Sequence, residues 1–248
     1  LYTGEVLGNK NGPTFDIAVD PVEGTNFVAN NLSGGITVLA VAEKGNLFNA
    51  PETYMSKIAT GKIDKGVVDL DYPLEKNIKN ISEFNNKEVS SLTVCILDRP
   101  RHKQIIDKLK DLKVNIKLIK DGDVLGALYV SDPKYNVDMF LGTGGGPEGV
   151  IAASALDAYE CHFQGRFIFD NEKDVKEAKS MGIIDLDKKY DLFELVKGDS
   201  LFCATGITNN DFLNGIKIDN NKYVSETFVT HKESNLKKII KNVISLDE

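Results

Sequence analysis

The sequence predicts a layered α/β fold, because short apolar runs alternate with segments of helical periodicity along its 248 residues. Strand, loop and helix patterns follow one another repeatedly between residues 92 and 159. This order is typical of a sheet whose ligand-binding loops lie at the carboxyl ends of its strands. With 42% hydrophobic residues, the chain can bury one large core or two smaller ones.

Short runs rich in Val, Ile, Leu or Phe are typical of buried strands. We expect strands at residues 15–20, 36–42, 92–97, 114–119, 137–141, 201–204 and 224–230. Helical patterns occupy residues 51–60, 101–112, 123–130, 147–159, 172–181 and 235–243. Pro51 at a first-turn position favours the first of these helices, and Ile105, Ile106 and Leu109 share one face of the second.

Polar composition suggests where the chain divides. Residues 73–90 are polar and rich in asparagine, so they are the expected boundary between two sub-domains, residues 1–90 and 91–248. A second polar segment, residues 170–189, is expected to be an exposed charged helix with its flanks.

Charge, cysteine usage and hydropathy exclude several classes of protein. The net charge of −7 argues against broad nucleic-acid binding. No apolar run approaches the roughly 20 residues that span a bilayer, so no membrane insertion is expected. Three widely spaced cysteines cannot all pair, which indicates reduced thiols and a cytoplasmic protein. No histidine spacing suits zinc, and we expect bystander roles for Cys161, Cys203, His162 and His231.

The first candidate loop follows the expected strand at residues 15–20, in the stretch FDIAVDPVEGTN. Asp20 and Glu23 present carboxylates three residues apart, and oxygen ligands of this kind select Mg²⁺ or Mn²⁺ over Zn²⁺. Gly24 and Thr25, at the start of a helix, can face a phosphate with their amides. An N-capped turn without any ligand is an equally weighted interpretation.

Two further loops carry charge at strand ends. Arg99, Pro100 and Arg101 follow residues 92–97, and paired guanidinium groups can hold a phosphate. Asp121, Gly122 and Asp123 follow residues 114–119, where carboxylates can accept hydrogen bonds from sugar hydroxyls. In isolation, an exposed basic helix start and a tight capped turn are the simpler interpretations of these two segments.

The fourth loop reads GTGGGPEG over residues 142–149. Glu148 falls in the first turn of the following helix, where its carboxylate can complete a metal site. No Gly-Lys-Ser/Thr follows, and Pro147 stands where a dinucleotide fingerprint needs glycine. A structural turn stays possible, although three consecutive glycines are costly for one. Because all four loops follow an expected strand, they can open on one face of the fold.

These segments resemble the class II fructose-1,6-bisphosphatases of bacterial type, within the lithium-sensitive, metal-dependent sugar and inositol phosphatase superfamily. The resemblance rests on DIAVDPVEGT, NAPETYMSK, RPRH, DGDV, GTGGGPEGV and FCATGIT, in order along nearly the whole chain. It implies the layered helix–sheet sandwich of that superfamily. It also implies hydrolysis of the 1-phosphate of fructose 1,6-bisphosphate in gluconeogenesis, with Mg²⁺ or Mn²⁺ as cofactor.

The resemblance assigns roles that spacing alone does not. It makes Asp20, Glu23 and Glu148 metal ligands and Thr25 the residue that positions or activates the attacking water. The substrate pocket that it implies contains Glu23, Gly24, Thr25, Tyr54, Arg99, Pro100, Arg101, Asp121, Gly122, Asp123 and Gly145. It places the metal- and phosphate-binding part in residues 1–90, with further acidic ligands expected before the position that matches Leu1. Residues 91–248 are expected to complete the pocket.

Two other interpretations stay open at this point. A related phosphatase acting on sedoheptulose 1,7-bisphosphate or inositol phosphates has the same turn after its first strand. A sugar-phosphate-binding module without catalysis is a second alternative, because part of the implied metal site is not represented among these residues. A homo-oligomer, dimer or tetramer, is expected for the enzyme.

Overall fold

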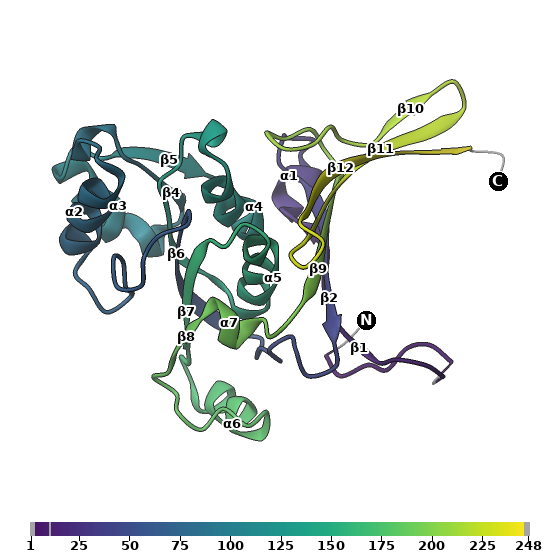
Figure 1. The fold of residues 1–248 in the computed structure, drawn as a ribbon, viewed down its shortest axis with the longest axis horizontal. Helices are drawn as coiled ribbons and strands as arrows, with labels where there is room; N and C mark the ends of the chain where they lie inside the picture. The colour runs from purple at the N-terminus through teal and green to yellow at the C-terminus, as the bar shows by residue number, and fades with distance from the viewer. Residues whose placement is uncertain (1–2, 10, 246–248) are drawn as a thin grey trace.

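The computed structural model describes residues 3–9 and 11–245. Two six-stranded sheets and their helices form successive layers, which confirms the layered α/β class. Helices α4 and α5 lie between the sheets, and α2 and α3 cover the outer face of one of them (Figure 1). Among the described residues, no helix is long and apolar enough to cross a membrane.

The first sheet has the order β1-β2-β9-β11-β10, with β12 paired to β11, and its neighbours are antiparallel. Its strands are β1 (Phe15–Glu23), β2 (Ile36–Glu43), β9 (Ser200–Gly206), β10 (Lys217–Asp219), β11 (Lys222–His231) and β12 (Leu236–Ser245). Strands β10, β11 and β12 extend beyond the rest of the molecule at one end of this sheet (Figure 1).

The second sheet has the order β5-β4-β6-β3-β7-β8. Its strands are β3 (Tyr54–Thr60), β4 (Thr93–Leu97), β5 (Asn115–Ile119), β6 (Met139–Gly145), β7 (His162–Ile168) and β8 (Lys189–Asp191). Strand β4 runs parallel to β5 and β6, whereas β3 is antiparallel to both of its neighbours. Each sheet therefore draws strands from both sides of residue 90, and a division of the chain there stays a prediction.

The helices complete the layers. They are α1 (Thr25–Ala29), α2 (Leu74–Asn85), α3 (Lys103–Asp111), α4 (Asp123–Leu128), α5 (Gly146–Asp157), α6 (Glu172–Ser180) and α7 (Leu192–Leu195). Short 3-10 turns occupy Val89–Ser91, Pro100–His102, Tyr129–Ser131 and Pro133–Tyr135.

Helix α5 is buried on all sides because it contacts strands of both sheets. Its small residues let the sheets approach. A Cβ at Gly149, for example, would lie 2.5 Å from the sulfur of Met55. The helix expected at residues 147–159 is thus confirmed, and its first turn is held rigidly between the two sheets.

Two helix predictions are wrong. Within residues 51–60, Tyr54–Thr60 form strand β3, which pairs on both edges with β6 and β7. A central strand buried on both faces has no alternating pattern, and Pro51 precedes this strand without starting a helix. Residues 235–243 lie almost entirely in β12, which pairs with β11 along its whole length. Its β-branched residues, Ile239, Ile240 and Val243, favour a strand.

The polar segment at residues 73–90 contains helix α2, which the asparagine-rich composition concealed. Asn77, Ile78 and Ile81 are its buried residues, and the two isoleucines pack against the second sheet. The Asn77 amide also exchanges hydrogen bonds with the backbone of Asp69. The segment is therefore part of a packed layer.

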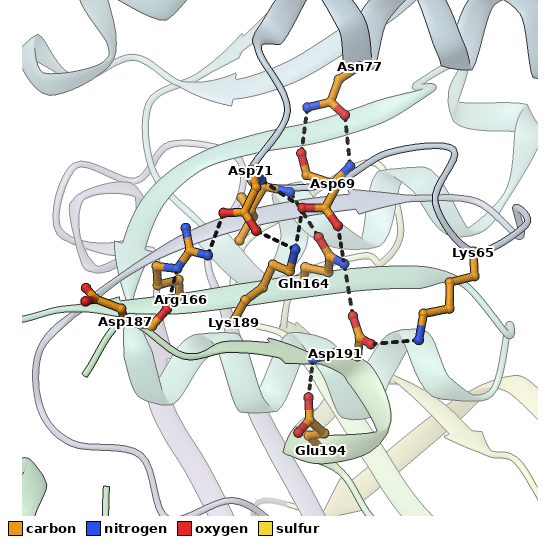
Figure 2. A network of polar contacts seen from close by, with 11 residues as sticks. Lys65, Asp69, Asp71, Asn77, Gln164, Arg166, Asp187, Lys189, Asp191 and Glu194 are labelled. Carbon is orange, nitrogen blue, oxygen red and sulfur yellow. Dashed lines mark hydrogen bonds and ion pairs between the residues drawn. The ribbon is translucent and has the colours of Figure 1, made fainter. Parts of the chain in front are cut away.

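A network of charged side chains joins the loop before α2 to the edge of the second sheet (Figure 2). Lys189 forms ion pairs with both Asp69 and Asp71, and Arg166 lies 2.6 Å from the Asp71 carboxylate. Gln164 donates to Asp191 at 3.0 Å. Each carboxylate of this paired network, defined as Asp69, Asp71, Lys189 and Arg166, faces a cation from β7 or β8.

Candidate active site

An irregularity in β1 brings Asp20 and Glu23 to one place. In a regular strand, residues three apart point to opposite faces of the sheet. The register of β1 against β2 shifts between these two residues, which breaks that alternation. The two carboxylates interact electrostatically, and this repulsion contributes to the raised pKa of Glu23. The turn that follows depends on Gly24, whose φ of +79° is unfavourable for other residues.

Glu23 is the last residue of β1, and its buried side chain lies against the start of α4. It is 6% exposed, and its Oε1 accepts a hydrogen bond of 2.8 Å from the amide of Val124. Its pKa is raised to about 8: burial is the largest cause, the Val124 hydrogen bond opposes it, and the carboxylates of Asp123, Asp20 and Glu148 add to the rise. These four acids, Asp20, Glu23, Asp123 and Glu148, are called the acidic cluster below.

Glu148 enters the cluster from the first turn of α5. Burial raises its pKa, Lys57 lowers it, and Asp123 and Asp20 raise it. Lys57, on β3, is 1% exposed and forms an ion pair with Asp123. Within the part of the chain that the structure describes, Asp123 Oδ1 and Glu148 Oε2 are buried without a hydrogen-bond partner. Buried polar atoms without partners are costly, so these two oxygens are suited to a ligand.

The glycine-rich loop makes room for these carboxylates. A Cβ at Gly144 would lie 2.3 Å from Oδ2 of Asp123, and a Cβ at Gly145 would lie 1.8 Å from Oε2 of Glu148. Gly145 has a φ of −66°, so its glycine is required by space and not by backbone conformation. Consecutive glycines in this loop thus have a direct cause in the packing of the acidic cluster.

Residues 99–102, called the arginine loop below, lie against the same glycine-rich segment. Arg101 donates from Nε and Nη2 to the carbonyl oxygen of Thr143 at 3.0 and 2.8 Å. Its guanidinium carbon lies 4.9 Å from the centroid of the Tyr54 ring. Tyr54, assigned by resemblance alone, therefore lies beside Arg101.

Arg99 connects the arginine loop to the loop at residues 121–123. Its Nη2 donates to Oδ1 of Asp121 at 3.1 Å, and Oδ2 of Asp121 accepts from the amide of Asn26 at 3.3 Å. Both oxygens of Asp121 thus accept hydrogen bonds from the protein, whereas Asp123 Oδ1 has no hydrogen-bond partner among the described residues. The four loops expected to open together are in fact joined by direct contacts.

Helix α1 begins at Thr25 but has only five residues. The dipole of so short a helix is small. The groups left to hold a phosphate are therefore the backbone amides that precede the first helical hydrogen bond, which Phe27 N donates to Gly24 O. The side chain of Thr25 is exposed.

The acidic cluster has the donor chemistry of a magnesium or manganese site. Its donors are oxygens, which hard divalent cations prefer, and its mutual repulsion would be relieved by a cation. In residues 3–9 and 11–245, however, no three His, Cys, Asp or Glu side chains are arranged so that they could hold a metal ion together. Joint binding of one ion by Asp20, Glu23 and Glu148 stays a prediction.

The sequence did not point to Lys57 or to a role for His102. A lysine in the middle of an apolar strand is a usable signal, because an unpaired buried lysine is rare. His102 is 1% exposed and makes hydrogen bonds through both ring nitrogens. Cys161 and Cys203 are free thiols, and burial raises the pKa of Cys161 to about 12.

Comparison with known proteins identifies the family. Residues 1–244 match the family model described as bacterial fructose-1,6-bisphosphatase, glpX-encoded. A protein of Synechococcus sp. (strain JA-2-3B'a(2-13)) is 40% identical across 94% of this chain and 75% of its own length. The corresponding values are 39%, 88% and 70% for Prochlorococcus marinus (strain MIT 9515), and 37%, 98% and 78% for Trichodesmium erythraeum (strain IMS101).

All three relatives carry the name D-fructose 1,6-bisphosphatase class 2/sedoheptulose 1,7-bisphosphatase. The family model covers residues 1–244, which include all four loops of the candidate site. The chain therefore belongs to the family of bacterial, glpX-encoded fructose-1,6-bisphosphatases, and it is a metal-dependent phosphoric monoester hydrolase.

Proposed function

We propose that this protein hydrolyses the 1-phosphate of fructose 1,6-bisphosphate to fructose 6-phosphate and inorganic phosphate, as a step of gluconeogenesis. The family and the names of the relatives support this reaction. The observation that carries it is the position of the acidic cluster beside the arginine loop. A cluster of buried carboxylates suits a cation and the phosphate it neutralises, while two arginines suit a second phosphate.

We assign Asp20, Glu23 and Glu148 as ligands of Mg²⁺ or Mn²⁺. When bound, the cation supplies positive charge to the phosphoryl oxygens and lowers the pKa of the attacking water. The unpartnered oxygen of Glu148 supports this assignment. The raised pKa of Glu23, caused first by burial and then by neighbouring carboxylates, also supports a functional role for this residue.

The remaining residues bind and orient the sugar bisphosphate. Arginine has five N–H donors, and Arg101 uses its Nε and Nη2 donors on Thr143, which leaves others for a phosphate. We assign Asp123 Oδ1 to a sugar hydroxyl. The proposed pocket as a whole contains Glu23, Gly24, Thr25, Tyr54, Arg99, Pro100, Arg101, Asp121, Gly122, Asp123 and Gly145.

Thr25 orients the attacking water in this proposal. Thr25→Ala should lower kcat by at least about 100-fold, a size typical of lost proton-transfer groups, with a much smaller change in KM. The exposed Thr14, replaced by alanine, is a matched control on the same strand region. A change confined to KM would remove Thr25 from the chemistry.

The reaction itself is tested by phosphate release from purified protein with Mg²⁺ or Mn²⁺. Fructose 1,6-bisphosphate, sedoheptulose 1,7-bisphosphate and inositol 1-phosphate should be compared at equal concentration. Sedoheptulose 1,7-bisphosphate is the second candidate substrate, because the names of the relatives include it. Release from inositol 1-phosphate alone, or from none of the three, would overturn the proposal.

The protein is proposed to act in the cytoplasm as a homo-oligomer, either a dimer or a tetramer. Free cysteines support the compartment. Exposed apolar side chains on β12, among them Ile239, Val243 and Ile244, support association. Light scattering of the purified protein measures the oligomeric state, and a monomer at micromolar concentration would contradict it.

A further inference from the structure

His102 is a buried histidine whose tautomer follows from its contacts. It ends the 3-10 turn after β4 and is 1% exposed. Its Nε2 accepts a hydrogen bond of 2.8 Å from the amide of Thr143, and a backbone amide can only donate. The proton therefore resides on Nδ1, which donates to the carbonyl oxygen of Leu97 at 2.7 Å. Burial lowers the pKa of His102, and the charge of Arg101 lowers it further.

His102 and Arg101 both form hydrogen bonds with Thr143. The Thr143 amide donates to His102, while the Thr143 carbonyl oxygen accepts from Arg101. Arg101 and His102, two consecutive residues of the arginine loop, thus bind both backbone polar groups of Thr143 in β6. Gly142 leaves room for the imidazole, since a Cβ there would lie 3.1 Å from Cε1 of His102.

This arrangement fixes the relative position of two parts of the site. Leu97 is the last residue of β4, whereas Thr143 directly precedes Gly144 and Gly145, which accommodate the carboxylates of Asp123 and Glu148. The imidazole therefore connects the end of β4 to the glycine-rich segment that accommodates the acidic cluster. Side chains that orient the residues in contact with a ligand often matter nearly as much as those residues.

We propose that His102, as a neutral imidazole protonated on Nδ1, is a positioning residue that sets the guanidinium of Arg101 for the second phosphate of the substrate. It does not touch the substrate. This inference rests on the proposed function, because it requires a sugar bisphosphate whose second phosphate lies against Arg101. Loss of His102 should therefore weaken recognition of that phosphate and spare the reacting one.

The test compares fructose 1,6-bisphosphate with fructose 1-phosphate, which lacks the second phosphate, in the protein at its natural length. His102→Leu should raise KM for the bisphosphate by about 10-fold, with little change in kcat. For fructose 1-phosphate, kcat and KM should both stay close to the wild-type values. His162 on β7, replaced by asparagine, is a matched histidine control. This variant should leave kcat and KM unchanged for both substrates.

Two nearly isosteric variants distinguish the two hydrogen bonds. His102→Gln places an amide oxygen where Nε2 accepts from Thr143, and it should restore most of the KM. His102→Asn preserves the donor to Leu97 alone and should keep the defect. In an Arg101→Ala background, His102→Leu should add nothing, because coupled residues are not additive.

Calorimetric dissociation constants for both sugar phosphates provide a second readout that does not depend on turnover. Equal effects on both ligands, additivity with Arg101→Ala, or rescue by asparagine instead of glutamine would overturn the role of His102. Absence of phosphate release from the wild type would count against the proposed function instead. In that case, the same pattern of dissociation constants is still required for His102.

Discussion

Two groups of acids in this molecule are treated in opposite ways. In the paired network of Figure 2, Lys189 and Arg166 face Asp69 and Asp71. Burial raises the pKa of Asp69, but hydrogen bonds from Lys189, the Asp71 amide and Gln164, with the charge of Lys189, together hold that pKa below its usual range. Hydrogen bonds from Lys189 and then Arg166 lower the pKa of Asp71.

The acidic cluster has more carboxylates than nearby cations. Lys57 pairs with Asp123, yet burial and mutual repulsion still raise the pKa values of Glu23 and Glu148. Uncompensated charge in a protein interior is expensive, and the chain shows elsewhere that it can compensate acids with lysine and arginine. The surplus of carboxylates at the acidic cluster supports the proposal that this cluster binds a divalent cation, which the predictions below test.

The largest expected difference between the two groups is in turnover. Glu23→Gln should lower kcat with Mn²⁺ by at least about 100-fold, as losses around metal sites do, and Asp20→Ala should behave alike. Asp71→Asn in the paired network is the control, and it should keep nearly full activity. If the Glu23 variant turned over substrate as fast as this control, the acidic cluster would not be the catalytic centre.

The next largest effect concerns stability. Lys57→Met leaves Asp123 buried without its cation, which typically costs about 3–5 kcal/mol. Urea unfolding measures this loss, and addition of Mn²⁺ should recover part of it if the cluster accepts a cation. A loss under about 1 kcal/mol, the level of exposed ion pairs, would mean that the Lys57–Asp123 pair does not depend on burial.

In metal-free protein, the free energy of unfolding should decrease as pH rises through the range between the unfolded and folded pKa values of Glu23. Glu23 has an ordinary pKa of 4.5 and a folded pKa of about 8. Between these values the folded state binds more protons than the unfolded state, so the free energy of unfolding decreases with rising pH. Glu23→Gln should flatten this slope in urea titrations with chelator present. An unchanged slope in the variant would assign the pH dependence to another group.

The smallest effect on stability is expected in the paired network, where the free energy of unfolding should decrease as pH falls. Because the pKa values of Asp69 and Asp71 are lowered, their stabilisation is present above the ordinary aspartate pKa of 3.8 and is lost as pH falls through the folded values. Lys189→Met should cost about 0.5–1 kcal/mol at neutral pH, since the pair is partly exposed. The same variant should reduce the acid sensitivity. Thermal unfolding between neutral and acidic pH checks both.

The elements that the sequence failed to predict, β3, α2 and β12, differ from their predictions for identifiable physical reasons. Strand β3 resembles a helix in sequence because both of its faces are buried, which removes the alternation of polar and apolar residues. Helix α2 is concealed because Asn77 is polar and buried, held by the backbone of Asp69. Strand β12 follows β11 through a turn that periodicity does not record. For β3 and α2, contacts with segments distant in the sequence decide the element, whereas in β12 the β-branched residues and the pairing with the neighbouring strand β11 agree.

The candidate site shows the same division. The four loops follow from local chemistry: carboxylates after a strand, arginines after another, and glycines before a helix. Their contacts do not, since Arg99 reaches Asp121 and Arg101 reaches Thr143 across the sheet. The glycines at 144 and 145 illustrate the limit, because the atoms that exclude a side chain there belong to Asp123 and Glu148.

By itself, the order of residues determined the layered class, the buried helix α5 and the four loops, because periodicity and turn chemistry act over a few neighbours. Folding in three dimensions decided which charges are compensated and which are not. It placed Lys57 beside Asp123 and His102 beneath Thr143, pairs separated by tens of residues in the chain. Electrostatic energy depends on distance in space and on burial, and neither quantity is written in the local sequence.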